Sequence, residues 1–234
     1  NTITVEFYRQ KLYAWIQAGP WSQQQKQEIC KSLQCFRSID NQSDATSSVL
    51  SQLNDWWENH GIQCIDIAAS SDRVTLSNGK PIAITDKVCH PISGAKQTVT
   101  APATTKPSYF SVIENTPDPE YVFWWLWRFS PEWEQNSTDS LLNAAHPVLP
   151  DCSWHSYQNT VSALAGAISH DNPDLESHPY LFLFSFSPIQ DFIKASRKFL
   201  DFWAGSYLLH YLSAQLCWRI AQKYGPDALI VPSL

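Results

Sequence analysis

The segment Leu181–Ser187 (LFLFSFS) constrains the fold more than any other part of the chain. Five of its seven residues are bulky and apolar, which is typical of a β-strand buried on both faces. Ser187 then stands at a helix N-cap position, Pro188 at the first helical position and Gln190 three residues after the cap, which forms a capping box. The pattern predicts a buried strand that leads into a capped helix, as in α/β or ferredoxin-like domains that handle nucleotides.

The predicted helix has an apolar face and a basic face. One face is marked at helical spacing by Ile189, Phe192, Ile193, Ser196, Phe199, Leu200 and Trp203, all apolar except the serine. Lys194, Arg197 and Lys198 lie on the other face, where Asp191 and Asp201 could pair with them. A helix N-terminus with basic residues on its next turn is also suited to phosphate. Both interpretations of the basic residues stay open.

The first 178 residues read as mainly helical. Apolar spacing, caps and Gly/Pro stops predict helices, at residues 4–17, 22–36, 43–59, 62–71, 120–129 and 154–168, with a break at Gly61. Asn78-Gly79 is a hairpin turn signal with a short strand expected on each side. Residues 95–119, rich in Thr, Pro and Ala, are expected to form a long loop.

A polar, proline-bearing stretch, residues 170–179, predicts a boundary between domains 1–178 and 179–234. Beyond it we expect the strand, two helices broken at Gly205, a stop at Gly225-Pro226 and a strand at Ala228–Val231. The two parts differ in charge. Residues 1–178 carry eleven Lys/Arg against nineteen Asp/Glu, whereas residues 179–234 carry five against three. A phosphate backbone would meet the second part more readily.

The six cysteines show no Cys-x-x-Cys spacing, and no apolar run approaches the ~20 residues of a membrane span. With no signal peptide visible, we expect reduced, mostly buried thiols in a cytoplasmic protein that has no membrane partner.

Several motifs resemble one known family. They are Ser185-Phe-Ser-Pro-Ile-Gln190, Ala195-Ser-Arg-Lys198, Asp201-Phe-Trp-Ala-Gly-Ser-Tyr-Leu208 and Tyr224-Gly-Pro-Asp-Ala228. They are similar to the start of the first palm domain in the large subunit of type III CRISPR RNA-guided effector complexes, in the Cmr form. Weaker similarity upstream, as at Phe123-Trp-Trp-Leu-Trp-Arg128 and His90-Pro-Ile-Ser-Gly94, is to the HD-type domain of that subunit.

The resemblance implies a mainly α chain: a helical HD-like domain, then the opening β-α-α-β part of a ferredoxin-like palm domain. It implies that the intact subunit assembles with other effector subunits in antiviral defence, meets guide and target RNA, and makes cyclic oligoadenylate from ATP with a divalent metal. Residues that would contact the nucleotide are Ser187, Gln190, Arg197, Lys198 and Ser206. The cyclase signature Gly-Gly-Asp-Asp is absent from these residues, so we expect no catalytic residue and no cofactor here.

The family's metal-binding His-Asp dyad would fall directly after Leu12-Tyr-Ala-Trp-Ile16, where this chain has Gln17 and Ala18. Glutamine is a weak neutral ligand and alanine has no donor atom, so the sequence predicts a domain without nuclease activity. Weaker metal candidates are Asp72, His90 and Asp151, with His60, His155 and the dipeptide His170-Asp171 behind them. Each also has an ordinary structural role to play, in a turn, a cap or a linker.

Two other functions stay open: a metal-dependent HD phosphohydrolase or nuclease with a rearranged ligand set, and a non-catalytic helical interaction domain. Trp124, Trp125 and Trp127 could stack on nucleic-acid bases, although neighbouring helical aromatics more often face a core or an interface.

Overall fold

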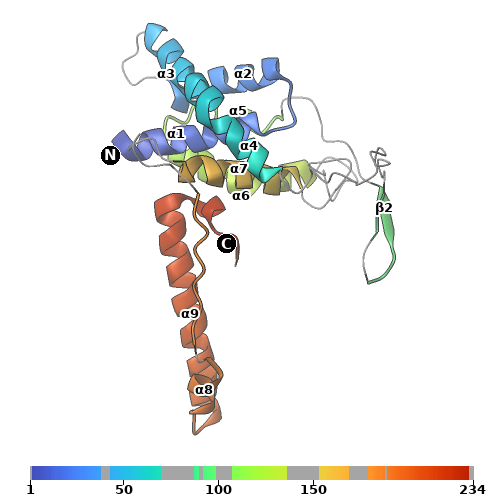
Figure 1. The fold of residues 1–234 in the computed structure, drawn as a ribbon, viewed down its shortest axis with the longest axis vertical. Helices are drawn as coiled ribbons and strands as arrows, with labels where there is room; N and C mark the ends of the chain where they lie inside the picture. Colours follow the sequence, from blue (N-terminus) through green and yellow to red (C-terminus); the bar gives the residue numbers. More distant parts are fainter. Residues whose placement is uncertain are drawn as a thin grey trace.

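The computed structural model describes residues 2–37, 43–69, 87–89, 92–98, 107–135, 153–168, 179–187 and 189–231. Within them the chain is mainly helical, as predicted (Figure 1). The α-helices are α1 (Thr2–Gln17), α2 (Gln23–Ser32), α3 (Ser43–Trp56), α4 (Ile62–Ala68), α5 (Phe110–Ile113), α6 (Pro119–Gln135), α7 (Trp154–Ala167), α8 (Ile189–Lys194) and α9 (Phe199–Tyr224).

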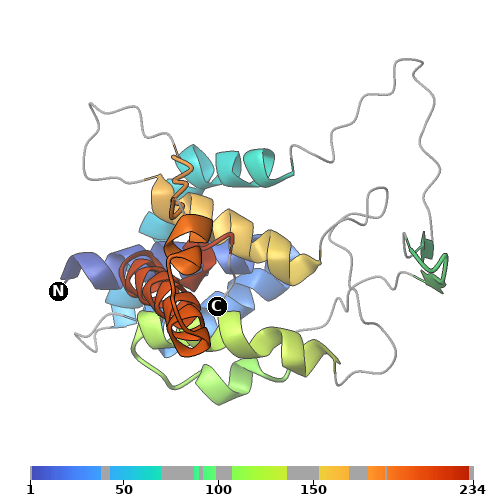
Figure 2. The same cartoon turned by 90° about the horizontal axis from the view of Figure 1, so that it is seen from below.

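Helices α1 to α7 form a helical body around α1 (Figures 1 and 2). Every residue from Lys11 to Gly19 is buried, as expected around Leu12–Ile16, five successive apolar residues that give the helix no polar face there. Helices α6 and α7 pack against α1. The largest fully buried apolar side chains of the body are Trp15, Tyr8, Tyr109, Phe36, Phe110, Phe123, Leu12, Ile16, Ile29, Leu33 and Leu53.

The predicted helix over 22–36 is divided in two. Ser22 caps α2 in a capping box with Gln25, because each side chain accepts a hydrogen bond from the other residue's backbone N–H. Leu33 is extended and ends α2, and a 3₁₀ turn, η1 (Gln34–Phe36), follows.

The predicted helix break at Gly61 is wrong. The chain passes from α3 into α4 through a π-helical turn, η2 (Trp57–Gly61), with no interruption. A Cβ on Gly61 would lie 2.2 Å from Cε3 of Trp57. The glycine therefore makes room for an indole ring inside a continuous helix.

The described hairpin lies later in the chain than the predicted turn. Antiparallel strands β1 (Lys87–Cys89) and β2 (Lys96–Thr98) pair with Lys87 opposite Thr98. Gly94, between the strands, has φ +69°, which glycine adopts readily. Asn78-Gly79 lies outside the described residues. The expected loop over 95–119 is wrong where β2 and α5 occur.

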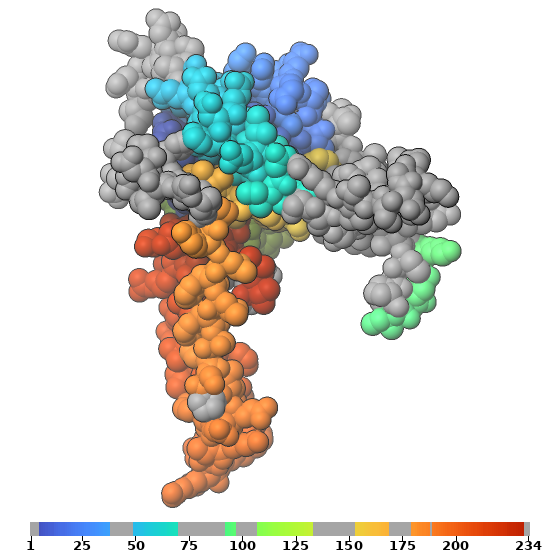
Figure 3. All heavy atoms as spheres, in the orientation of Figure 1, coloured from blue at the N-terminus to red at the C-terminus, as the bar shows by residue number. Residues whose placement is uncertain are grey.

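Residues 179–224, which we call the arm, extend away from the body (Figures 1 and 3). Residues 179–187 run beside α9 without regular secondary structure, so the predicted strand is not formed. A strand needs the backbone of a neighbouring strand, and no described segment offers one here. Leu181 and Leu183 are 81% and 89% exposed.

The arm's helices also differ from the prediction. Helix α9 continues through Gly205, and the break lies at residues 195–198, where Lys198 is extended. One helical glycine costs only ~1 kcal/mol, which the long flanking sequence offsets. The single apolar face predicted from Ile189 to Trp203 is therefore divided between α8 and α9.

The chain turns at Gly225-Pro226, as predicted, but the strand expected at Ala228–Val231 is wrong. Gly225 has φ +94° and ends α9, and a 3₁₀ turn, η4 (Pro226–Ala228), follows. The N–H groups of Ala228 and Leu229 donate to the carbonyls of Gly225 and Pro226. These backbone groups are thus used within the turn.

Candidate functional site

The position predicted for the missing metal dyad lies at the buried end of α1. Gln17 and Ala18 are 7% and 3% exposed. The Lys26 ammonium, on α2, donates to the Gln17 carbonyl at 2.6 Å. The Gln158 amide, on α7, donates to the Trp15 carbonyl at 3.1 Å. Polar side chains of this chain therefore already occupy the surroundings of the position.

The indole of Trp21 also packs next to the position of Gln17 and Ala18. A Cβ on Gly19 would lie 2.3 Å from Cζ3 of Trp21, so the ring packs directly on the backbone after Ala18. Burial lowers the pKa of Lys26, whose ammonium already donates to the Gln17 carbonyl. Among the described residues, no three His, Cys, Asp or Glu side chains gather where they could hold a metal.

The weaker metal candidates are mostly untested. Asp72, His90, Asp151 and His170-Asp171 lie outside the described residues. The helix expected to follow a cap at Asp151 is capped instead by Ser153, whose hydroxyl accepts from the N–H of Ser156 at 3.2 Å.

His155 is held as a structural residue. Its Nε2 lies 2.9 Å from the Trp127 carbonyl, which requires that nitrogen to carry the proton and donate it. Nδ1 can then accept from the Asn159 amide at 3.4 Å. Burial lowers the pKa of His155. The imidazole therefore joins α7 to α6 and is not free to bind a metal.

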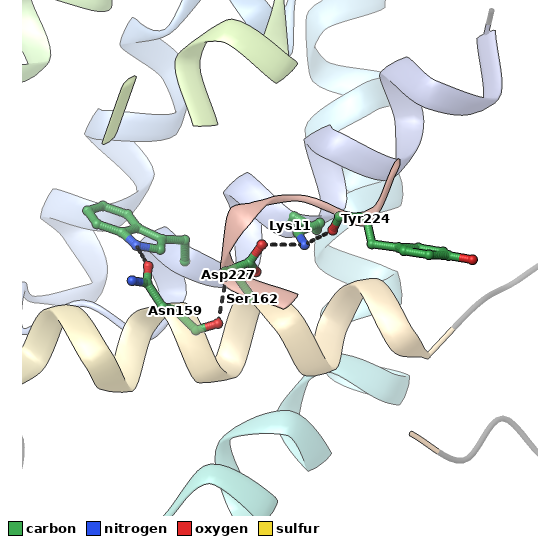
Figure 4. Close-up of polar contacts among 6 residues, drawn as sticks. Lys11, Asn159, Ser162, Tyr224 and Asp227 are labelled. Atoms are coloured by element: carbon green, nitrogen blue, oxygen red, sulfur yellow. Dashed lines mark hydrogen bonds and ion pairs between the residues drawn. The ribbon is translucent and has the colours of Figure 1, made fainter. Parts of the chain in front are cut away.

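A buried ion pair that the sequence analysis missed joins α1 to the end of the arm (Figure 4). The Lys11 ammonium lies 2.7 Å from Oδ1 of Asp227 and 2.6 Å from the Tyr224 carbonyl. The Ser162 hydroxyl donates to Oδ2 of Asp227 at 2.6 Å. We call Lys11, Ser162, Tyr224 and Asp227 the Lys11–Asp227 cluster. The sequence signal for this ion pair is a lysine next to the apolar residues of α1, which would need a partner when buried.

A cavity of about 740 Å³ opens beside this cluster, between α6, α7 and the residues after α9. Its polar wall comes from Arg128, His155, Ser156, Asn159, Thr160 and Asp227. Each of these side chains makes at least one hydrogen bond or ion pair within the chain.

The predicted nucleotide-contacting residues all lie on the outer part of the arm. Ser187 and Gln190 are exposed at the start of α8, and Arg197 and Lys198 are exposed in the turn before α9. Ser206 is half-buried in α9, beside Gly205, whose Cβ would lie 3.5 Å from Phe192 of α8. The capping box at Ser187 is untested because Pro188 lies outside the described residues.

The tryptophan cluster on α6 packs within the protein. Trp124 contacts Trp127 and Trp218 of α9, with ring centroids 6.2 and 5.8 Å apart, and Trp125 contacts Tyr109 and Phe129. All three tryptophans are half-buried. This arrangement favours the core and interface interpretation.

The described cysteines are buried and unpaired, as predicted for Cys30, Cys35, Cys64 and Cys217. Burial raises the pKa of Cys64 to about 11 and of Cys35 to about 12. Such thiols stay protonated at neutral pH and react slowly.

The arm and the residues after it are also where the chain is similar to known proteins. The family described as CRISPR-associated protein Cmr2, N-terminal, matches residues 181–234. These residues resemble the amino-terminal part of the Cmr2 large subunit. The CRISPR system Cmr subunit Cmr2 of Pyrococcus furiosus is 45% identical over 56 residues, which are 24% of this chain and 6% of that protein. No solved structure matches the chain. No helix in the described part of the chain is long and apolar enough to cross a membrane.

Proposed function

We propose that this chain is the amino-terminal region of the large subunit of a type III-B CRISPR effector complex, acting in the cytoplasm. The match to Cmr2 over residues 181–234 carries this proposal. The subunit assembles with other Cmr subunits, meets guide and target RNA through the complex, and makes cyclic oligoadenylate from ATP with the help of a divalent metal. This region serves as scaffold and regulatory surface.

The exposure of the arm supports the proposal. The residues that match Cmr2 include a large group of exposed apolar side chains, at Leu181, Phe182, Leu183, Phe184, Phe199, Leu200, Phe202, Trp203, Tyr207, Leu208, Tyr211 and Leu212. Exposed apolar surface of this kind marks a place where protein packs. In the proposed subunit, residues 179–234 begin a ferredoxin-like palm domain, and residues 181–187 become a strand when a neighbouring strand pairs with them.

ATP would bind at the outer part of the arm. Ser187 and Gln190 stand at the start of α8, while Arg197 and Lys198 are exposed cations in the next turn, as suits a phosphate chain. Ser206 completes the proposed contacts. The metal of the reaction would be held by residues of the intact subunit beyond those described.

The filled dyad position supports a non-catalytic role for the helical body. Gln17 and Ala18 supply no metal ligand of useful strength, and the Lys26 amine and the Trp21 indole occupy their surroundings. The body would then serve to position the arm.

Purification of the intact protein tests the assignment to an effector complex. An affinity-tagged intact protein recovered from its own cells should carry other Cmr subunits and short guide RNA, detected by mass spectrometry and RNA sequencing. Recovery without either component contradicts the proposal.

Calorimetric titration of the intact protein with ATP tests the nucleotide site. Arg197→Ala with Lys198→Ala should weaken ATP binding while the melting temperature changes little, because exposed charges contribute only ~0–1 kcal/mol. Arg219→Ala, at an exposed arginine of α9, is the matched control. Equal ATP affinity in the double variant and the control removes these residues from the site.

A further inference from the structure

The arm meets the helical body over a small area. Along α9, only Cys217 and Ala221 are buried, and all of α8 lacks buried residues. Pro226 and Asp227 of η4, just after α9, are buried as well. The orientation of the long exposed part of α9 therefore depends on contacts made by residues 217–227.

Within this area, the Lys11–Asp227 cluster makes directional hydrogen bonds, which fix how its groups lie relative to one another. Side chains of Lys11 and Asp227 are 1% and 0% exposed, and both carboxylate oxygens of Asp227 are used, by Lys11 and by Ser162. The cluster joins α1, α7 and η4, three elements far apart in sequence (Figure 4).

The same ammonium also holds the last turn of α9. Tyr224 is the last residue of that helix, and its carbonyl accepts from Lys11 at 2.6 Å. A cation is favourable at a helix C-terminus, where carbonyl groups lack helical partners. The rings of Phe7 and Phe123 lie 5.2 Å from the Lys11 nitrogen on other sides. The end of α9 is thus fixed by a buried charge.

Gly225 adapts the backbone to this contact. Its φ of +94° is one that other residues rarely adopt. A Cβ there would lie 2.6 Å from Oδ1 of Asp227 and 2.7 Å from the Lys11 nitrogen. Both the backbone and the space around the ion pair therefore require glycine.

We propose that the Lys11–Asp227 cluster is the conformational coupling between the helical body and the arm, and fixes the angle at which the arm leaves the body. A buried ion pair cannot be stretched gradually, because separating its partners leaves a desolvated charge. Another contact of the arm with the body, between Trp124 and Trp218, is apolar, and Trp218 is 46% exposed. Apolar contact is non-directional, so it permits rotation that the ion pair prevents. The coupling holds whether or not the chain belongs to an effector complex.

Distance measurements between two spin labels test this coupling. Labels are attached at Gln27→Cys in the body and Asp201→Cys in the arm, both exposed positions, in the full chain with Cys89 and Cys152 replaced by Ser. Double electron–electron resonance then measures the distribution of distances between the two labels. We expect one narrow distribution for the parent chain and a broad one for Lys11→Met and for Asp227→Asn.

Arg128→Ala is the matched control, because it removes an exposed ion pair with Glu132 near the same cavity. It should leave the distribution narrow. Near-ultraviolet circular dichroism checks that each variant keeps its packed body. A narrow, unshifted distribution in a folded Lys11→Met chain overturns the proposal. If Lys11→Met does not fold, Asp227→Asn decides, since it removes the carboxylate charge and keeps the shape of the side chain. It should broaden the distribution, and an unchanged distribution again overturns the proposal.

Discussion

At the scale of single residues, burial decides how the polar side chains of this protein behave. Lys11, Lys26 and His155 are all carried into low-dielectric surroundings, and burial lowers the pKa of each. They differ in which groups accept their hydrogen bonds. Lys11 donates to a carboxylate as well as to a backbone carbonyl, whereas Lys26 and His155 each donate to a backbone carbonyl.

His155 makes stability depend on pH. Because its folded-state pKa lies below the unfolded value of about 6.5, the unfolded chain binds more protons between the two values. The free energy of unfolding therefore rises with pH in that window, and acidification through it costs stability. We expect the urea midpoint to fall less between pH 7 and pH 5 in His155→Gln than in the parent chain. An equal fall in both would show that His155 does not contribute.

If the HD resemblance holds, the packing around Gln17 and Ala18 predicts that this chain has no metal-dependent nuclease activity. The Lys26 ammonium donates to the Gln17 carbonyl, and the Trp21 indole packs on Gly19, the residue after Ala18. The chain should leave single-stranded DNA and RNA intact in Mn²⁺, Ni²⁺ or Mg²⁺, as followed on denaturing gels. Cleavage that disappears in Asp72→Ala or His90→Ala would show a rearranged ligand set instead.

At the scale of elements, glycine has three different roles here. Gly61 makes room for Trp57 inside a helix, and Gly225 adopts a φ of +94° to end one. Gly205 does neither, because it lies within α9 and its nearest neighbour, Phe192, would be 3.5 Å from an added Cβ. Composition alone cannot distinguish these cases, since each requires knowing what lies beside the glycine.

Gly205→Ala should stabilise α9. Alanine is favoured over glycine inside a helix by up to ~1 kcal/mol, and the 3.5 Å contact leaves room for the methyl group. Slower amide exchange of α9 in the variant would confirm the continuous helix. Gly225→Ala is the contrasting substitution, and it should lower the melting temperature strongly. Faster exchange of α9 in Gly205→Ala would indicate a break at that residue.

At the scale of the whole molecule, the body and the arm bury apolar surface very differently. The body has one contiguous core around α1, whereas the arm leaves Phe199 and Trp203 81% and 60% exposed. Apolar surface of this extent favours association when no other protein covers it.

We therefore expect the isolated chain to self-associate through the arm. Phe199→Glu with Trp203→Glu should shift sedimentation velocity toward the monomer, with the melting temperature unchanged because neither side chain is in the core. Ile67→Glu, at an exposed apolar residue of the body (45% exposed), is the matched control and should leave association unchanged. A monomeric parent chain at tens of micromolar would rule out the arm as an associating surface.

The sequence by itself determined most features that depend on near neighbours. Apolar spacing predicted the helices at 4–17, 120–129 and 154–168, and Gly225-Pro226 predicted the turn after α9. The motifs at the start of the arm also indicated the similarity to Cmr2 over residues 181–234. Each of these signals acts over a few residues, so it can be read directly along the chain.

Only the tertiary structure decided the features that join distant residues. Lys11 and Asp227 are 216 positions apart, and no local pattern connects a lysine in α1 with an aspartate after α9. The segment Leu181–Ser187 has a strand's composition but lacks a described neighbour to pair with, because strand hydrogen bonds run between segments and not within one. Local propensity therefore specified the helices, while burial and pairing across the molecule decided the ion pair, the packing around Gln17 and Ala18, and the conformation of the arm.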